Sequence, residues 1–193
     1  MAYTPKILAF AGSLRVESWN KKLVKIAVNG AKAAGADVTY IDLKDYPLPV
    51  FDEDLEKKDG LHPNARKLKD LFMANDGLLI SAPEYNSSIT AALKNAIDWV
   101  SRPAPGEAPL GCFDGKVVSL MSASPGALGG LRGLVTVRSI LGNIKCTVLP
   151  DQVAVPKVND AMNPDGTLKD AKVQASIEAL GANVAKTVAK LKG

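Results

Sequence analysis

The sequence predicts an α/β fold in which a parallel five-stranded sheet is covered by helices on both faces. Short apolar runs alternate along the chain with amphipathic stretches, which is the order of strands and helices in such folds. The apolar runs are continuous rather than alternating, as expected for strands that are buried on both faces. The 193 residues contain no repeat and no long linker, so residues 1–193 are expected to form one domain.

Five apolar runs predict the strands. They lie at 7–10, 38–41, 77–80 and 117–121, and the fifth strand is either 147–149 or 153–155. Between them, apolar residues at steps of three or four predict helices. The first helix ends at Gly35, Pro63 begins the second, Thr90 caps the third, and the fourth ends near Gly142. The last helix has an apolar face made of Val173, Ile177, Leu180, Val184, Val188 and Leu191. The segment 45–60, rich in Pro and Asp, is expected to be a connection.

Composition excludes several classes of protein. The net charge is only +4, aromatic residues make up 5%, and no basic run is longer than a pair, which does not fit nucleic-acid binding. No apolar run approaches the roughly 20 residues of a membrane span, and the N-terminus lacks a signal-peptide pattern. Cys112 and Cys146 have no metal-binding spacing and are expected to be reduced thiols. We therefore expect a cytoplasmic protein that binds neither nucleic acid nor a membrane.

The sequence contains a single histidine, His62, in front of Pro63. One histidine excludes a histidine-rich zinc site, and no G-x-S-x-G motif supplies a serine for a catalytic triad. His62 is expected to be a solvated residue at a helix start. If the chain is an enzyme, its chemistry is therefore expected to come from a bound cofactor.

Ligands of open parallel sheets bind beyond the carboxyl ends of the strands, so the loops after strands one, three and four are the candidate site. The first loop leads into a helix N-terminus, where unpaired N–H groups and the helix dipole favour an anion. Arg15 adds a guanidinium suited to phosphate. Because the loop has one glycine, Gly12, a terminal monophosphate is favoured over a pyrophosphate or triphosphate. The alternative is a plain helix start capped by Ser18. The candidate phosphate loop comprises Ser13, Leu14, Arg15, Val16, Glu17, Ser18, Trp19 and Asn20.

The second loop follows the third strand and contains Glu84, Tyr85, Asn86 and Ser87. A flat heteroaromatic ligand needs apolar or aromatic walls and hydrogen-bonding partners at its rim, which the main chain and the Asn86 side chain could supply. The alternative is a turn that begins the helix at Thr90. In the third loop, Ser124 lies among small residues that allow the backbone to approach a ligand closely.

Three segments together resemble the NADPH-dependent FMN reductase family, and within it the bacterial chromate and quinone reductases. They are Gly-Ser-Leu-Arg at 12–15, Pro-Glu-Tyr-Asn at 83–86 and Leu-Lys-Asn-Ala-Ile-Asp-Trp at 93–99. The resemblance spans essentially the whole chain. It implies a flavodoxin-like three-layer sandwich with strand order 2-1-3-4-5 and bound FMN. It also implies that residues 13–20 hold the phosphate, residues 84–87 hold the flavin ring, and Ser124 makes a third contact.

The resemblance implies an oxidoreductase that takes a hydride from NADPH or NADH and passes two electrons to a small-molecule acceptor in ping-pong fashion. Quinones, free flavin, chromate and ferric complexes are the expected acceptors, and no side chain is needed as a catalytic acid or base. Two alternatives stay open. A flavodoxin-type electron carrier would usually be acidic, whereas this chain is basic. A dinucleotide dehydrogenase would use Asp42 to bind ribose, but its second and third glycines are missing.

The resemblance also implies a homodimer or homotetramer. Trp99 and Arg102 lie at the end of the third helix, in a region that forms the subunit interface of relatives. Core packing of Trp99 is the alternative. Arg132 falls where relatives carry an arginine linked to subunit contacts or to the mouth of the substrate site.

Overall fold

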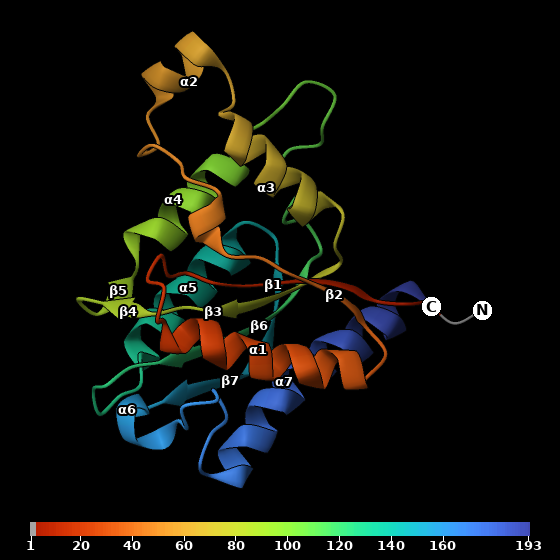
Figure 1. Cartoon of the computed structure of the whole chain (residues 1–193). Helices are drawn as coiled ribbons and strands as arrows, with labels where there is room; N and C mark the ends of the chain where they lie inside the picture. Colours follow the sequence, from red (N-terminus) through yellow and green to blue (C-terminus); the bar gives the residue numbers. More distant parts are fainter. Residues whose placement is uncertain (1–2) are drawn as a thin grey trace.

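Five parallel strands form the central sheet of the computed structural model, which describes residues 3–193 (Figure 1). In chain order these strands are β1 (Lys6–Ala11), β2 (Asp37–Tyr40), β3 (Gly77–Ser81), β6 (Val117–Ala123) and β7 (Thr147–Val155). They are arranged in the order β2-β1-β3-β6-β7. The labels β4 and β5 belong to a separate hairpin, so this order is the predicted 2-1-3-4-5. The predicted fold class is confirmed.

Helices cover both faces of the sheet (Figure 1). They are α1 (Trp19–Ala33) and α7 (Ala171–Lys192) on one face, and α3 (Pro63–Met73), α4 (Ala91–Val100) and α5 (Leu131–Asn143) on the other. The sheet has a hydrophobic core on each face, and successive side chains of an interior strand point alternately into the two cores. In β1, Ile7 and Ala9 pack under α1, whereas Leu8 and Phe10 pack under α3 and α4. This two-sided burial explains why the strands read as continuous apolar runs. Within residues 3–193, no helix combines the length and the apolarity needed to cross a bilayer.

The fifth strand contains both of the segments that were predicted as alternatives. β7 pairs with β6 in one register up to Val148 and in a shifted register from Gln152 onward, so the residues between them bulge out of the ladder. Pro150 lies in this bulge, where a missing N–H costs nothing because β7 is an edge strand. The bulge separates two apolar runs in the sequence although the chain forms one strand.

Two helices and a helical turn were not predicted. They are the 3₁₀ turn Leu43–Asp45, α2 (Glu53–Asp59) and α6 (Val158–Ala161). Segment 45–60 is therefore not an irregular connection throughout. α2 begins at Asp52, whose side chain accepts a hydrogen bond from Asp54 N, and it buries no residue. Apolar periodicity could not reveal it, because α2 buries no apolar side chain and contacts the chain through the ion pair of Glu56 with Arg102.

Predicted helix boundaries agree more closely with the structure. Gly35 follows α1 with a φ of 87°, a backbone conformation that suits glycine. The Thr90 side chain caps α4 by accepting a hydrogen bond from Leu93 N. His62 caps α3 through Nδ1, so it is a half-buried capping residue rather than a merely solvated one. Cys112 and Cys146 are buried free thiols, as expected.

Helices α1 and α7 pack closely because each places a glycine against the backbone of the other. A Cβ at Gly30 would overlap the carbonyl oxygen of Glu178, and a Cβ at Gly181 would overlap that of Ala27. This contact fixes α1, whose N-terminus faces the carboxyl ends of the strands.

Replacing Gly181 with alanine is expected to lower the free energy of unfolding by about 1–3 kcal/mol, the usual cost of overpacking. Gly142→Ala is the matched control, because Gly142 also lies in a helix but a Cβ there meets nothing within 4 Å. The control should leave stability unchanged or raise it by up to about 1 kcal/mol, since alanine is the better helix former. Urea unfolding measures both, and equal stability of the two variants would contradict the packing described.

A charged cluster holds the loop before β6 against α3. Glu107 pairs with Arg66 and with Lys69, each at 2.5 Å. Lys69 is buried and also donates to the carbonyl oxygen of Arg102. The hydrogen bonds from Lys69 and then Arg66 lower the pKa of the Glu107 carboxyl below its usual value.

Because the pKa of Glu107 is lower in the folded state, its ion pairs stabilise the protein above the ordinary glutamate pKa of about 4.3 and are lost as the pH falls below it. Glu107→Gln is therefore expected to be less stable than wild type at pH 7, with a difference that shrinks between pH 5 and pH 3. Asp54→Asn serves as the control, because the Asp54 carboxylate is 94% exposed and lies 3.9 Å from Lys57. Parallel stability curves for wild type and Glu107→Gln would show that the ion pairs do not stabilise the fold.

Candidate functional site

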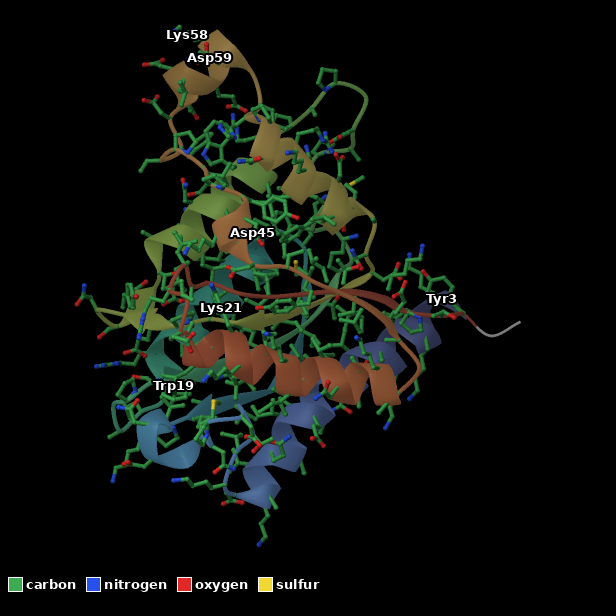
Figure 2. The ribbon with its side chains drawn as sticks, in the orientation of Figure 1. Tyr3, Trp19, Lys21, Asp45, Lys58 and Asp59 are labelled. Carbon is green, nitrogen blue, oxygen red and sulfur yellow. The ribbon has the colours of Figure 1, made fainter. Side chains whose placement is uncertain are left out.

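The loops that follow β1, β3 and β6 meet around one small cavity of about 70 Å³. Its walls are Ser13, Arg15, Ser18, Trp19 and Asn20 from the first loop, Pro83, Glu84 and Tyr85 from the second, and Ala123, Ser124 and Pro125 from the third. Figure 2 shows Trp19 and Lys21 at the beginning of α1. The structure thus brings together the three loops singled out in the sequence.

Five of the candidate residues do not line this cavity. Val16 and Glu17 are exposed and line none of these hollows, and Leu14 lines two neighbouring hollows instead. Asn86 and Ser87 form an exposed turn beyond Tyr85. Of the candidate phosphate loop, only Ser13, Arg15, Ser18 and the start of α1 therefore line the cavity.

The N-terminus of α1 carries no side-chain cap. Ser18 occupies the N-cap position with extended backbone, yet its hydroxyl makes no capping hydrogen bond, and the first turn holds no acidic residue. The alternative of a plain helix start capped by Ser18 is therefore wrong. Two buried hydroxyls, those of Ser13 and Ser18, and the exposed Arg15 surround N–H groups that need an acceptor. This arrangement has the charge and the donors that a phosphate requires.

Asn20 joins the three loops through its side-chain amide. Oδ1 accepts hydrogen bonds from Ser81 Oγ (2.8 Å) and from Ala123 N (3.0 Å), and Nδ2 donates to the carbonyl oxygen of Ala123 (2.9 Å). The amide is buried, so these bonds hold the start of α1 against the ends of β3 and β6 without competition from water. Asn20 is thus mainly a positioning residue. Ser81 was not singled out in the sequence, because its partner is 61 residues away.

A second tie connects the first loop to α4. Thr90 Oγ1 donates to the carbonyl oxygen of Gly12 at 2.6 Å while accepting from Leu93 N. Gly12 must lack a side chain here, because a Cβ would lie 2.8 Å from the Cβ of Leu93. The sequence predicted Thr90 as a helix cap but gave no sign of this contact, which spans 78 residues.

The second loop is a tight hairpin. β4 (Glu84–Tyr85) and β5 (Ser88–Ile89) are antiparallel, and the two turn residues, Asn86 and Ser87, have φ values of 51° and 65°. Positive φ at both positions gives the turn the twist that suits a two-residue hairpin. The expected loop is therefore a two-residue hairpin, and the Tyr85 side chain on it is 55% exposed and lines the cavity.

The carboxylate of Glu84 fixes this hairpin to α5. Oε1 accepts from the Arg132 guanidinium at 2.9–3.0 Å, and Oε2 accepts from Gly133 N at 3.1 Å in the first turn of α5. A Cβ at Gly133 would lie 3.2 Å from the carbonyl oxygen of Ser88 and 3.3 Å from the Cβ of Glu84, so a glycine here eases the close approach of α5 to the hairpin. Only the main chain of Glu84 therefore remains for a ligand. Arg132 was expected at a subunit contact or the substrate mouth; in the chain itself it orients Glu84.

Other predicted residues are accounted for by contacts within the chain. Ser124 Oγ accepts from Gly126 N at 3.1 Å, which orders the third loop. Asp42 pairs with Lys21 at 2.5 Å and caps the 3₁₀ turn through Lys44 N. Both carboxylate oxygens of Asp42 therefore have partners within the chain. Trp99 is fully buried and donates to the carbonyl oxygen of Pro49, which confirms the core-packing alternative.

Asn20→Ala is expected to lower the free energy of unfolding by about 2–4 kcal/mol, because it leaves buried groups of Ser81 and Ala123 without partners. Asn159→Ala, at an exposed asparagine in α6, is the control and should change stability by no more than about 0.5 kcal/mol. Urea unfolding compares the two. An effect of Asn20→Ala as small as that of the control would show that the amide does not hold the loops.

Comparison with known proteins shows which family the chain belongs to. The profile of the NADPH-dependent FMN reductase family matches residues 5–160, which include all three loops. The chain belongs to this family. Membership confirms the resemblance seen in the sequence, together with FMN as the cofactor and NAD(P)H as the electron donor.

Relatives in the family share a large part of the chain. The NAD(P)H-dependent FMN reductase of Pseudomonas aeruginosa is 32% identical over 174 residues, which cover 90% of this chain and 89% of the relative. A quinone reductase of Escherichia coli K12 is 33% identical over 136 residues, or 70% of this chain and 69% of that one. Among solved structures, the flavoenzyme NAD(P)H:(acceptor) oxidoreductase FerB of Paracoccus denitrificans superposes with a TM-score of 0.77 at 24% identity, covering 97% and 98% of the two chains. This last likeness supports the fold.

Proposed function

We propose that the cavity binds the phosphate of FMN and that the hairpin β4–β5 supports the flavin ring. The observation that carries the proposal is the α1 N-terminus, which is uncapped and surrounded by two hydroxyls and a guanidinium. Such a site fits a terminal monophosphate. The proposed cofactor-binding residues are Ser13, Leu14, Arg15, Val16, Glu17, Ser18, Trp19, Asn20, Glu84, Tyr85, Asn86, Ser87 and Ser124.

Within this set the residues have different roles. Ser13, Ser18 and Arg15 bind the phosphate directly, and Asn20 positions the loops that carry them. Main-chain groups of the hairpin bind the rim of the ring, since the Glu84 carboxylate is engaged by α5. Bound FMN supplies the hydride and electron chemistry between NAD(P)H and the acceptor. The cavity walls offer no histidine, and their one acid, Glu84, has its carboxylate paired with Arg132 and Gly133 N, which agrees with chemistry that belongs to the cofactor.

We further propose a two-electron reductase of small molecules, with quinones as the principal acceptors. In the net reaction, NAD(P)H, a proton and a quinone give NAD(P)⁺ and a hydroquinone. Quinone reductases among the relatives support this choice. Free flavin, chromate and ferric complexes are further acceptors under the same proposal, in which nicotinamide and acceptor would bind in turn, in ping-pong fashion. A flavodoxin-type carrier is disfavoured by the net charge of +4.

The proposed assembly is a homodimer or homotetramer in the cytosol. Exposed apolar side chains gather on the hairpin, on the loop before α5 and on α5 itself, namely Tyr85, Leu128, Leu131 and Val135. Such a surface next to a cavity favours contact with another subunit. The buried free thiols are compatible with a reducing compartment. Sizing chromatography at several concentrations tests the assembly.

The proposed activity is tested with the FMN-loaded protein. NADH and NADPH are titrated without oxygen while the flavin absorbance is followed, and a quinone is then added. Bleaching by either nicotinamide and recovery with the quinone are expected. A stable blue semiquinone without NAD(P)H oxidation would instead establish an electron carrier, and no reaction with either nicotinamide would reject the reductase.

Arg15→Ala is expected to weaken FMN binding by about 1.5–3 kcal/mol, the usual contribution of a hydrogen bond to a charged group. Quenching of flavin fluorescence measures the dissociation constant. Lys58→Ala is the control, because it also removes one positive charge but lies at the tip of α2, far from Trp19 and Lys21 (Figure 2). FMN affinity that is equally unaffected in both variants would show that Arg15 does not bind the phosphate.

A further inference from the structure

Two hollows lie on the other side of the first loop from the phosphate cavity. One has a volume of about 290 Å³ and the other of about 350 Å³, and both are lined by Leu14, Ala92 and Asn95. They are enclosed by the first loop, by the segment 43–51 and by the N-terminal turns of α4. Because three residues line both, the hollows adjoin each other, and we call the pair the α4 depression.

The α4 depression adjoins the proposed flavin site. Leu14 stands between Ser13 and Arg15, which both line the phosphate cavity, and it is itself half exposed. α4 begins directly after the hairpin β4–β5, and the two lie next to each other in Figure 1. The hydrogen bond from Thr90 to the carbonyl oxygen of Gly12 joins these walls. The depression therefore lies beside the residues that are proposed to hold FMN.

The residues that line the α4 depression favour an apolar ligand. Asn95 uses both ends of its amide within the chain, since Oδ1 accepts from Phe51 N and Nδ2 donates to the carbonyl oxygen of Pro49, both at 2.8 Å. Lys94 is paired with Asp98 at 2.7–2.8 Å. The remaining surface is mostly hydrocarbon, including Leu14, Leu48, Val50, Phe51, Ala92 and Ala96. Val50 is 84% exposed, so a ligand that covers it removes apolar surface from water.

We propose that the α4 depression binds the hydrocarbon side chain of a quinone whose head group is reduced at the flavin. The inference rests on the proposed function and extends it from quinones in general to quinones that carry an apolar chain. The depression adds affinity for the chain without taking part in electron transfer. A chain-bearing quinone should therefore have a lower KM than the same head group without a chain, by roughly fourfold for each methylene fully buried.

The test fills the depression with Ala92→Leu, a change at a half-buried helix position that lines both hollows. The substrates are 2,3-dimethoxy-5-methyl-1,4-benzoquinone and the same quinone with a decyl chain. In the variant, the KM for the decyl quinone is expected to rise by about tenfold, while kcat and the KM for the chain-free quinone stay unchanged. Ala175→Leu, at an exposed position of α7 that lines neither hollow, is the control and should alter neither KM.

Equal changes in KM for both quinones, or none for either, would overturn the inference. A loss of assembly in Ala92→Leu on sizing chromatography, with both KM values raised, would identify the depression as a subunit contact and also overturn it. Failure of wild type to reduce either quinone would reject the proposed function. In that case equilibrium dialysis of the decyl quinone tests the binding part of the inference by itself: weaker binding to Ala92→Leu than to wild type would show that the depression binds the chain, and equal binding would overturn this part as well.

Discussion

The site depends on one buried amide that joins segments far apart in the chain. Asn20 begins α1, and its side chain binds the ends of both β3 and β6. A sheet alone aligns these strand ends, but it does not set the distance between the loops that leave them. The amide sets it, because both of its ends are used and it is shielded from water. The start of α1 and the ends of β3 and β6, which carry the walls of the cavity, are therefore held together by contacts within the chain.

Packing elsewhere supports this arrangement. The glycine contacts between α1 and α7 prevent α1 from moving along the sheet, so its positive end stays directed at the cavity. The Glu84 carboxylate provides the anion at the N-terminus of α5, which removes that helix end as a competing anion site. Of the two helix ends near the cavity, the one at α1 is left for a ligand. Preorganised donors of this kind lower the cost of ordering a bound group.

The two sides of the first loop have opposite chemistry. Toward the hairpin, Ser13, Arg15 and Ser18 offer hydrogen-bond donors to an anion, whereas on the other side Leu14 faces the apolar α4 depression. A single loop thereby separates a polar anchor from a hydrophobic surface. That division fits the proposal that one side of the loop holds a charged cofactor and the other side receives an apolar chain.

The sequence by itself determined the α/β class, the strand order through the family resemblance, and the three loops that form the site. It could do so because strands buried on both faces are continuous apolar runs and because ligand loops follow their carboxyl ends. It could not determine α2, which has no apolar face, or the single bulged strand β7, which appears as two runs. Only the tertiary structure decided that Ser18 leaves its helix uncapped, that Glu84 binds α5, and that Asn20 joins the strand ends. Two of these outcomes depend on contacts between residues 48 to 103 positions apart. The third depends on whether the Ser18 hydroxyl makes a capping hydrogen bond. Local sequence patterns encode neither.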